Sequence, residues 1–242
     1  MSNLLEIRGL VKEYGALRPL RIRDLAVAPS AVMSIAGIDA KGAEVFVNLV
    51  TGATLPEEGT VALFGSDTRA IADAAAWLKS LDGIGMITAR GVLIEAFSVL
   101  QNIAMSFTLD VDPIDPRVVP QAGAVARDAG IDASLFDVPA GKVAPEIQMR
   151  AHLARALAFN PQLLIAEHPS ASLPRAVVAS FGADLVKVAK SRSLALVALT
   201  ADDVLAKAIG GQRLELVPAT GELRAPGLLK KLFPSTRSRL LS

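Results

Sequence analysis

Two glycines separated by four residues, Gly37 and Gly42, have a spacing suited to holding a phosphate group. They lie between an apolar run at residues 31–35, which predicts a buried strand, and an apolar-periodic segment, which predicts a helix. Glycine allows a positive φ, and the backbone amides at a helix N-terminus face an anion favourably. The spacing therefore indicates a phosphate-binding loop.

The side chains of this loop depart from the complete motif, G-x-x-x-x-G-K-[ST], in which the lysine reaches the terminal phosphates and the hydroxyl ligates magnesium. Here these two positions hold Ala43 and Glu44. A carboxylate at a helix N-terminus is stabilised by about 0.3–1 kcal/mol, so Glu44 or Asp39 could fill the loop as a phosphate mimic. Alternatively, Glu44 is simply an acid in the first turn of the helix. Both interpretations disfavour a bound nucleotide.

The composition predicts one large domain with a substantial core, because 52% of the 242 residues are apolar. Twenty-five basic against 24 acidic residues give no overall attraction to nucleic acid. The absence of cysteine excludes disulfides and thiolate zinc sites, and fits a cytoplasmic protein. No apolar run approaches the ~18 residues that cross a bilayer. Membrane contact is therefore expected only through a partner.

Strands and helices are predicted to alternate along the chain, which indicates an α/β layer architecture. Half-buried strands are expected at residues 4–11 and 20–28, and further strands at 60–65, 163–166 and 194–199. Helices are expected around residues 70–80, 118–129 and 145–159.

The order and spacing of these segments resemble the nucleotide-binding subunit of an ABC transporter over nearly the whole chain. Residues 153–165 resemble the helix after the family's signature motif and the Walker B strand almost residue for residue. Residues 37–52 look like the Walker A loop and its helix. The resemblance implies a RecA-like P-loop core, an N-terminal antiparallel β layer and a helical subdomain inserted at about residues 92–159.

The positions that carry catalysis in this family are replaced in this chain. The Walker A lysine, the magnesium hydroxyl, the Q-loop glutamine, the Walker B aspartate, the catalytic glutamate and the switch histidine fall on Ala43, Glu44, Ala89, Glu167, His168 and Ala201. The signature falls on residues 143–147, which read Val-Ala-Pro-Glu-Ile. Phosphoryl transfer relies on positioned charges of this kind. The resemblance therefore predicts a catalytically degenerate subunit that is not an enzyme and takes no cofactor and no metal ion.

Two alternatives remain open. Tyr14, which matches the family's base-stacking aromatic residue, could form a residual nucleotide site with Gly37, Lys41 and Gly42. An active ATPase with relocated residues would use Lys41 for the phosphates, Glu167 for magnesium and His168 as base, and would bind ATP with magnesium weakly.

The partners implied by the resemblance are a transmembrane permease and a second ABC ATPase subunit, in a homodimer or heterodimer on the inner face of the cell membrane. Docking on the permease is predicted for residues 91–105, through Phe97, Val99 and Leu100, although these residues could instead form the core of the helical subdomain. A soluble adaptor without a permease is the further alternative. The basic tail at residues 223–242, with its apolar residues 228–233, is predicted to pack on this chain or on a partner.

Overall fold

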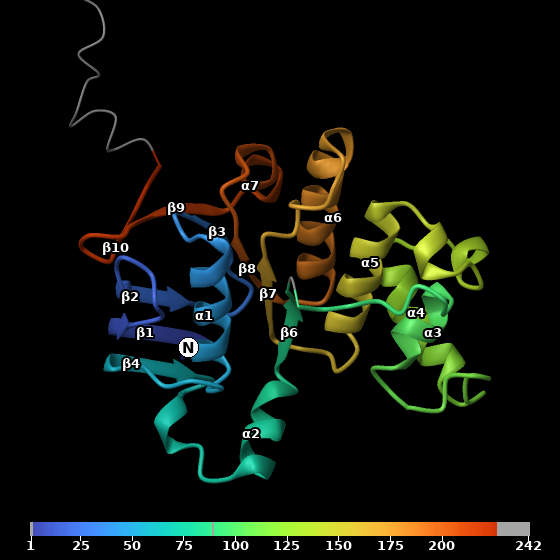
Figure 1. Ribbon diagram of the computed structural model, residues 1–242, viewed down its shortest axis with the longest axis horizontal. Helices are drawn as coiled ribbons and strands as arrows, with labels where there is room; N and C mark the ends of the chain where they lie inside the picture. Colours follow the sequence, from blue (N-terminus) through green and yellow to red (C-terminus); the bar gives the residue numbers. More distant parts are fainter. Residues whose placement is uncertain (1, 89, 227–242) are drawn as a thin grey trace, which may run out of the picture.

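A four-stranded antiparallel sheet and a six-stranded mixed sheet form the framework of the chain (Figure 1). The structure is a computed structural model that describes residues 2–88 and 90–226. The strands are β1 Leu5–Lys12, β2 Leu20–Val27, β3 Val32–Ala36, β4 Glu58–Leu63, β5 Ser66–Asp67, β6 Ile84–Ile87, β7 Leu163–Glu167, β8 Ala195–Leu199, β9 Gln212–Val217 and β10 Glu222–Arg224. The antiparallel sheet has the order β2-β1-β4-β5, and the mixed sheet has the order β10-β9-β3-β8-β7-β6. The predicted α/β fold is confirmed.

The helices of the described residues fall into groups on either side of the mixed sheet. They are α1 Ala40–Val50, α2 Ala74–Leu81, α3 Val99–Ala104, α4 Val119–Asp128, α5 Pro145–Ala156, α6 Val178–Ser191 and α7 Asp203–Ile209. Figure 1 shows α3, α4 and α5 together on the right, opposite the antiparallel sheet on the left. These three helices form the helical subdomain that the sequence predicts between the first and second halves of the core.

The mixed sheet separates two hydrophobic cores. Every residue of β7 is buried, and alternate residues of a strand face opposite sides of its sheet. Leu163 and Ile165 join the core with α1 and the antiparallel sheet, whereas Leu164 and Ala166 join the core with the helical subdomain and α6. The end of β7 is therefore fixed from both faces.

The antiparallel sheet shows the alternation that the sequence predicts for half-buried strands. In β2, Leu20 and Ile22 are buried, while Arg21 and Arg23 are exposed. Strand β1 pairs with both β2 and β4, so its apolar face lies against the core that contains α1.

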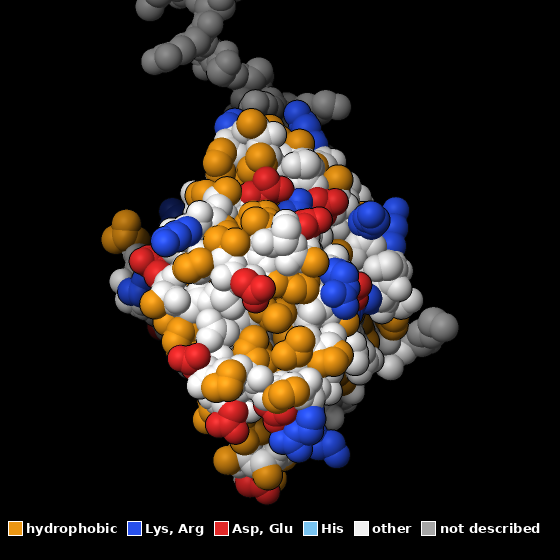
Figure 2. All heavy atoms as spheres, turned by 90° about the vertical axis from the view of Figure 1, so that its right-hand side faces the viewer, with side chains coloured by type: hydrophobic (Ala, Val, Ile, Leu, Met, Phe, Trp, Pro, Cys, Tyr) orange, Lys and Arg blue, Asp and Glu red, His pale blue; other side chains and the backbone are white. Residues whose placement is uncertain are grey.

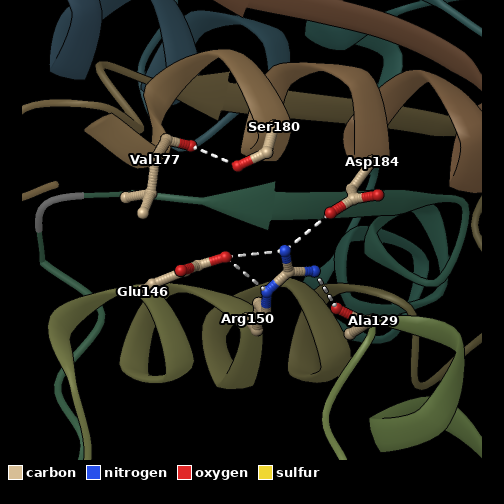
Figure 3. A network of polar contacts seen from close by, with 6 residues as sticks. All are labelled: Ala129, Glu146, Arg150, Val177, Ser180 and Asp184. Atoms are coloured by element: carbon tan, nitrogen blue, oxygen red, sulfur yellow. Dashed lines mark hydrogen bonds and ion pairs between the residues drawn. The ribbon is translucent and has the colours of Figure 1, made fainter. Parts of the chain in front are cut away.

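A buried arginine connects the helical subdomain to the rest of the core (Figure 3). Arg150 of α5 has a side chain that is only 9% exposed, and its Nη2 donates to Glu146 Oε1 at 2.8 Å and to Asp184 Oδ2 of α6 at 2.6 Å. Its Nη1 donates to the carbonyl oxygen of Ala129, just after α4, at 3.0 Å. One guanidinium therefore joins α4, α5 and α6.

The single tryptophan, Trp77, connects α2 to the far end of α1. Its indole Nε1 donates to the carbonyl oxygen of Thr51, the C-cap residue of α1, at 2.8 Å. Since α2 contains no fully buried residue, this hydrogen bond is its main polar attachment to the core.

Strands β9 and β10 near the end of the described chain were not predicted, and β10 forms one edge of the mixed sheet. β9 adds to the mixed sheet beside β3, and β10 pairs with it in antiparallel orientation, so residues 223 and 224 of the predicted tail belong to a strand. The apolar cluster predicted at residues 228–233 lies outside the described residues. Across residues 2–88 and 90–226, the helices are too short or too polar to cross a membrane.

Candidate functional site

The loop between β3 and α1 keeps a backbone shaped to receive an anion. Gly37 has φ +85°, and a Cβ atom there would lie 2.6 Å from the carbonyl oxygen of Leu216, so the position requires glycine. Helix α1 follows the N-cap residue Asp39, whose carboxylate accepts a hydrogen bond from the Gly42 amide at 2.7 Å. An amide that would face a phosphate therefore already has an anionic partner within the chain.

Ala43 and Glu44 lie one turn into α1 and have different surroundings. Ala43 is fully buried in the core beneath the loop. Glu44 is half-exposed, and its Oε1 accepts a hydrogen bond from Arg90 Nη1 at 3.2 Å. Because α1 begins at Ala40, the interpretation of Glu44 as a first-turn acid is wrong. Of the two acids expected to fill the loop, Asp39 contacts a loop amide, and Glu44 is turned toward Arg90 instead.

Tyr14 and Lys41 lie together at the mouth of the loop. The Lys41 Nζ is 5.9 Å from the centroid of the Tyr14 ring, which is a cation–π distance. Burial and the nearby charge of Asp39 raise the pKa of Tyr14. Tyr14, Gly37 and Asp39 line a cavity of about 570 Å³. The four residues of the predicted residual site, Gly42 among them, are thus brought into one region, with Lys41 directed at the ring.

Glu167 and His168 stand at the end of β7 and line a second cavity, of about 470 Å³, together with His152. Glu167 is 5% exposed, and burial raises its pKa, while the positive charge of Arg90 partly opposes this rise. In the part of the chain that the structure describes, Glu167 Oε2 and His168 Nε2 have no hydrogen-bond partner. A buried carboxyl group with a raised pKa and an imidazole therefore face the same cavity.

The backbone at His168 is unusual for a side chain of this size. Its φ is +43°, in the left-handed region that non-glycine residues rarely adopt. The His168 amide donates to the carbonyl oxygen of Leu199 at 2.9 Å, which holds this conformation against β8.

The position expected for the switch histidine carries only the methyl group of Ala201, which is exposed. The next residue, Asp202, caps α7 by accepting a hydrogen bond from the Val204 amide at 2.9 Å, and it pairs with Arg175 at 2.8 Å. Burial alone would raise the pKa of Asp202, but these hydrogen bonds outweigh it and lower the pKa. Asp202 is therefore a structural acid, and Ala89 lies outside the described residues.

The segment in the place of the signature begins α5. Pro145 is the first residue of that helix, as predicted, and the N-cap residue Ala144 offers no side-chain hydrogen bond. Glu146 pairs with Arg150, one turn further along the helix. Its carboxylate is therefore held inside the network of Figure 3.

Three exposed apolar residues lie in the segments that follow β6 and α5. Val92, Ile94 and Phe159 are 72%, 39% and 59% exposed. Met86, Arg155 and Phe159 help to line a cavity of about 220 Å³ there, and Arg155 Nη1 donates to the carbonyl oxygen of Val92 at 2.8 Å. Figure 2 shows that, on the end of the molecule formed by the helical subdomain, acidic and basic side chains are interspersed with hydrophobic ones.

The predicted docking residues are not among these exposed apolar residues. Val99 is fully buried and Leu100 is 6% exposed, because both belong to α3 and pack in the core of the helical subdomain. Phe97 is half-buried and packs against the same core. The prediction of Val99 and Leu100 as contact residues is wrong, and the alternative, that they are core residues, holds.

Sequence reasoning missed Arg90, the residue that reaches across the site. Its Nη1 also donates to Asn48 Oδ1 at 3.1 Å, so it bridges two positions of α1 from the loop that follows β6. The only available signal was a basic residue next to Ala89, the position predicted for the Q-loop glutamine, and this signal does not specify a partner 46 residues earlier in the chain.

Comparison with proteins of known function gives relatives of one kind. The chain is 25% identical over 241 residues to an Fe(3+) ions import ATP-binding protein, FbpC, of Mesorhizobium japonicum, covering 99% of this chain and 64% of the relative. It is 27% identical to the lipoprotein-releasing system ATP-binding protein LolD of Geobacter metallireducens, covering 87% of this chain and 94% of the relative. No family model matches the chain.

Solved structures share the fold. The ATP-binding cassette MJ0796, in a dimeric post-hydrolysis state bound to ADP and Pi, has a TM-score of 0.69 at 19% identity, covering 91% of this chain and 96% of that one. CbiO1 of Clostridium perfringens, part of the ABC transporter complex CbiONQ, has a TM-score of 0.73 at 19% identity and covers 97% of this chain and 92% of that one.

These findings correct one prediction. The sequence-based prediction that the chain takes no cofactor is contradicted, because the relatives are ATP-binding proteins and a neighbour in fold holds ADP and Pi. ATP is therefore the nucleotide whose binding requirements are compared with the residues of this site.

The side chains present do not fit the magnesium ion that the fold implies beside the nucleotide. Mg²⁺ takes oxygen ligands in an octahedral arrangement. Glu44 is paired with Arg90 and Asp39 with the Gly42 amide, which leaves Glu167, whose neutral form burial favours. Across residues 2–88 and 90–226 there is no group of three or more acidic or histidine side chains able to hold a metal ion.

Proposed function

Because this chain has the fold of an ATP-binding cassette and its relatives in sequence are ATP-binding subunits of transport systems, we propose that it is a subunit of a membrane ABC transporter that binds ATP without hydrolysing it. The observation that supports this most is the combination of an intact loop backbone with replaced side chains. Gly37 keeps the geometry of the loop, whereas Ala43 places a buried methyl group at the position of the phosphate-binding lysine.

The side chains around the loop support the proposal that the chain does not hydrolyse ATP. The transition state of phosphoryl transfer is stabilised by cations, a metal ion and a positioned base. Here Glu44 is neutralised by Arg90, and Ala201 offers no polar group. The relocated-ATPase alternative is less well supported, because Lys41 is directed at the Tyr14 ring.

Nucleotide binding is supported by the cavity beside Tyr14. Its volume of about 570 Å³ is within the range of small-molecule sites, and it is lined by an aromatic ring and by the loop residues Gly37 and Asp39. The acid at Asp39 opposes the phosphates, so the affinity we propose is modest.

The surface that we propose for the permease contains the exposed residues Val92, Ile94 and Phe159. Its exposed apolar side chains suit a short amphipathic helix of a membrane protein on the cytoplasmic side. Docking there would place the chain peripherally on the inner face of the membrane, in a dimer with a second copy or with an ATPase subunit.

Copurification from membranes tests this function. Phe159→Asp should abolish recovery of a permease with the tagged chain, because it places a carboxylate on the proposed apolar docking surface. Leu78→Asp is the matched control, since Leu78 on α2 is 60% exposed and Phe159 is 59% exposed. Equal recovery with both variants, or phosphate release from ATP that exceeds a protein-free blank, would contradict the proposal.

A further inference from the structure

Arg90 occupies a defined position over the start of α1. Its Nη1 donates to Glu44 Oε1 at 3.2 Å and to Asn48 Oδ1 at 3.1 Å. Glu44 and Asn48 are four residues apart and therefore lie on one face of the helix. Two acceptors on successive turns of α1 orient the guanidinium toward this face of the helix.

The residues next to Arg90 line the region where we expect the phosphates of a nucleotide to bind. Thr88 and Gly91, on either side of Arg90, line the same cavity as Ala40 at the start of α1 and Glu167 at the end of β7. The described hydrogen bonds of Arg90 all come from Nη1, so Nε and Nη2 keep donors for a ligand.

We infer that Arg90 takes the place of the divalent metal ion at this loop, so that ATP binds here without magnesium. This inference rests on the proposed function. A guanidinium is always charged and matches the geometry of phosphate oxygens, which makes it a suitable permanent cation for this position. Glu44, which would otherwise ligate a metal, neutralises the guanidinium while the loop is empty.

A metal ion and Arg90 would compete for the same carboxylate. Mg²⁺ bound by Glu44 would have to displace the guanidinium, and the two cations would repel each other at close range. Glu167 alone does not compensate for this loss, because its carboxyl group is buried. The donor set therefore favours the side-chain cation.

Calorimetric titration of the full chain with ATP, once in EDTA and once in MgCl₂, tests the inference. We expect affinity in EDTA at least equal to that in MgCl₂. Arg90→Ala should weaken binding in EDTA by about tenfold or more, the size expected for a charge-assisted hydrogen bond. Arg90→Lys should lose less, because it keeps the charge. Arg117→Ala, which breaks an ion pair whose arginine is 89% exposed, is the matched control and should bind as the wild type does.

Binding that requires MgCl₂, binding in EDTA that survives Arg90→Ala, or no binding under either condition would each overturn the inference. The titration of the wild type needs no variant, so a folding defect in Arg90→Ala does not obscure the result. Failure here is separate from failure of the proposed function: a chain that binds ATP only with magnesium, yet recovers a permease, retains the function and loses the role of Arg90.

Discussion

Glu44 and Glu146 each pair with an arginine, but the two ion pairs lie in different settings. Glu146 and Arg150 lie in one helix, and the Arg150 side chain is 9% exposed and also reaches Asp184. Glu44 and Arg90 join two separate segments, and their side chains are 45% and 46% exposed.

Burial decides what each pair contributes. Water screens the exposed pair, so it adds little to folding and stays available to a ligand. The buried arginine depends on its carboxylates, because removing a partner leaves an uncompensated charge. The Glu146–Arg150 pair is therefore a structural connection in the helical subdomain, whereas the Glu44–Arg90 pair is an exchangeable contact at the loop.

The strongest test of this contrast is Arg150→Ala. It should lower the free energy of unfolding by about 3 kcal/mol, because Glu146 and Asp184 lose their shared cation and the Ala129 carbonyl loses a donor. Urea denaturation measures the change. Arg117→Ala, at an exposed pair, should cost less than about 0.5 kcal/mol. Similar losses in the free energy of unfolding for the two variants would show that burial does not determine how much each ion pair contributes to stability.

A smaller effect is expected at the cap of α1. Asp39→Ala should lower the free energy of unfolding by about 1 kcal/mol, since the Gly42 amide loses its partner. The same change should raise the affinity for ATP, because that amide becomes free for a phosphate oxygen and a negative charge leaves the loop. Urea denaturation and calorimetry follow the two quantities. A parallel loss of stability and affinity would indicate that Asp39 shapes the loop and does not compete with ligand.

The buried carboxyl group of Glu167 should make the stability of the fold depend on pH, with an effect smaller than that of Asp39→Ala. Burial raises its pKa in the folded chain, so ionisation destabilises the native state above that pKa and the penalty disappears below the unfolded value of about 4.3. Glu167→Gln should therefore raise the melting temperature at pH 7, and the difference should vanish toward pH 4. A constant difference across this range would exclude ionisation as its cause.

The smallest effect is expected at the exposed pair. Glu44→Gln should change the free energy of unfolding by less than about 0.5 kcal/mol, and added salt should reduce even that. Thermal unfolding at low and high salt provides the measurement. A cost comparable with that of Arg150→Ala would remove the distinction between the two regions.

The framework could be predicted from the sequence because its signals are local. The alternation in β2 and the buried run that became β7 specify strands without reference to distant residues. The pairing of Glu146 with Arg150 could also be predicted, because residues four apart in a helix lie on the same face. The pairing of Arg150 with Asp184 could not, because Asp184 lies 34 residues further along the chain.

The candidate site was less predictable because its contacts are long-range. Nothing local distinguishes the apolar residues Val99 and Leu100 as core rather than surface, since α3 is short and apolar on more than one side. The contact of Arg90 with Glu44 depends on how the loop after β6 crosses α1, which the sequence does not encode as a pattern. The positive φ at His168 likewise arises from its hydrogen bond to β8.

The hydrogen bond from Trp77 to Thr51 makes the fluorescence of this tryptophan an intrinsic probe of helix α1. Helix α1 runs from the phosphate loop at one end to the Thr51 carbonyl at the other, where the chain's single indole is attached at 2.8 Å. A ligand that shifts the first turn of α1 would move that carbonyl along the helix axis and change the polarity around the indole. Intrinsic fluorescence would then follow occupation of the loop in real time, without a label and without any turnover of nucleotide.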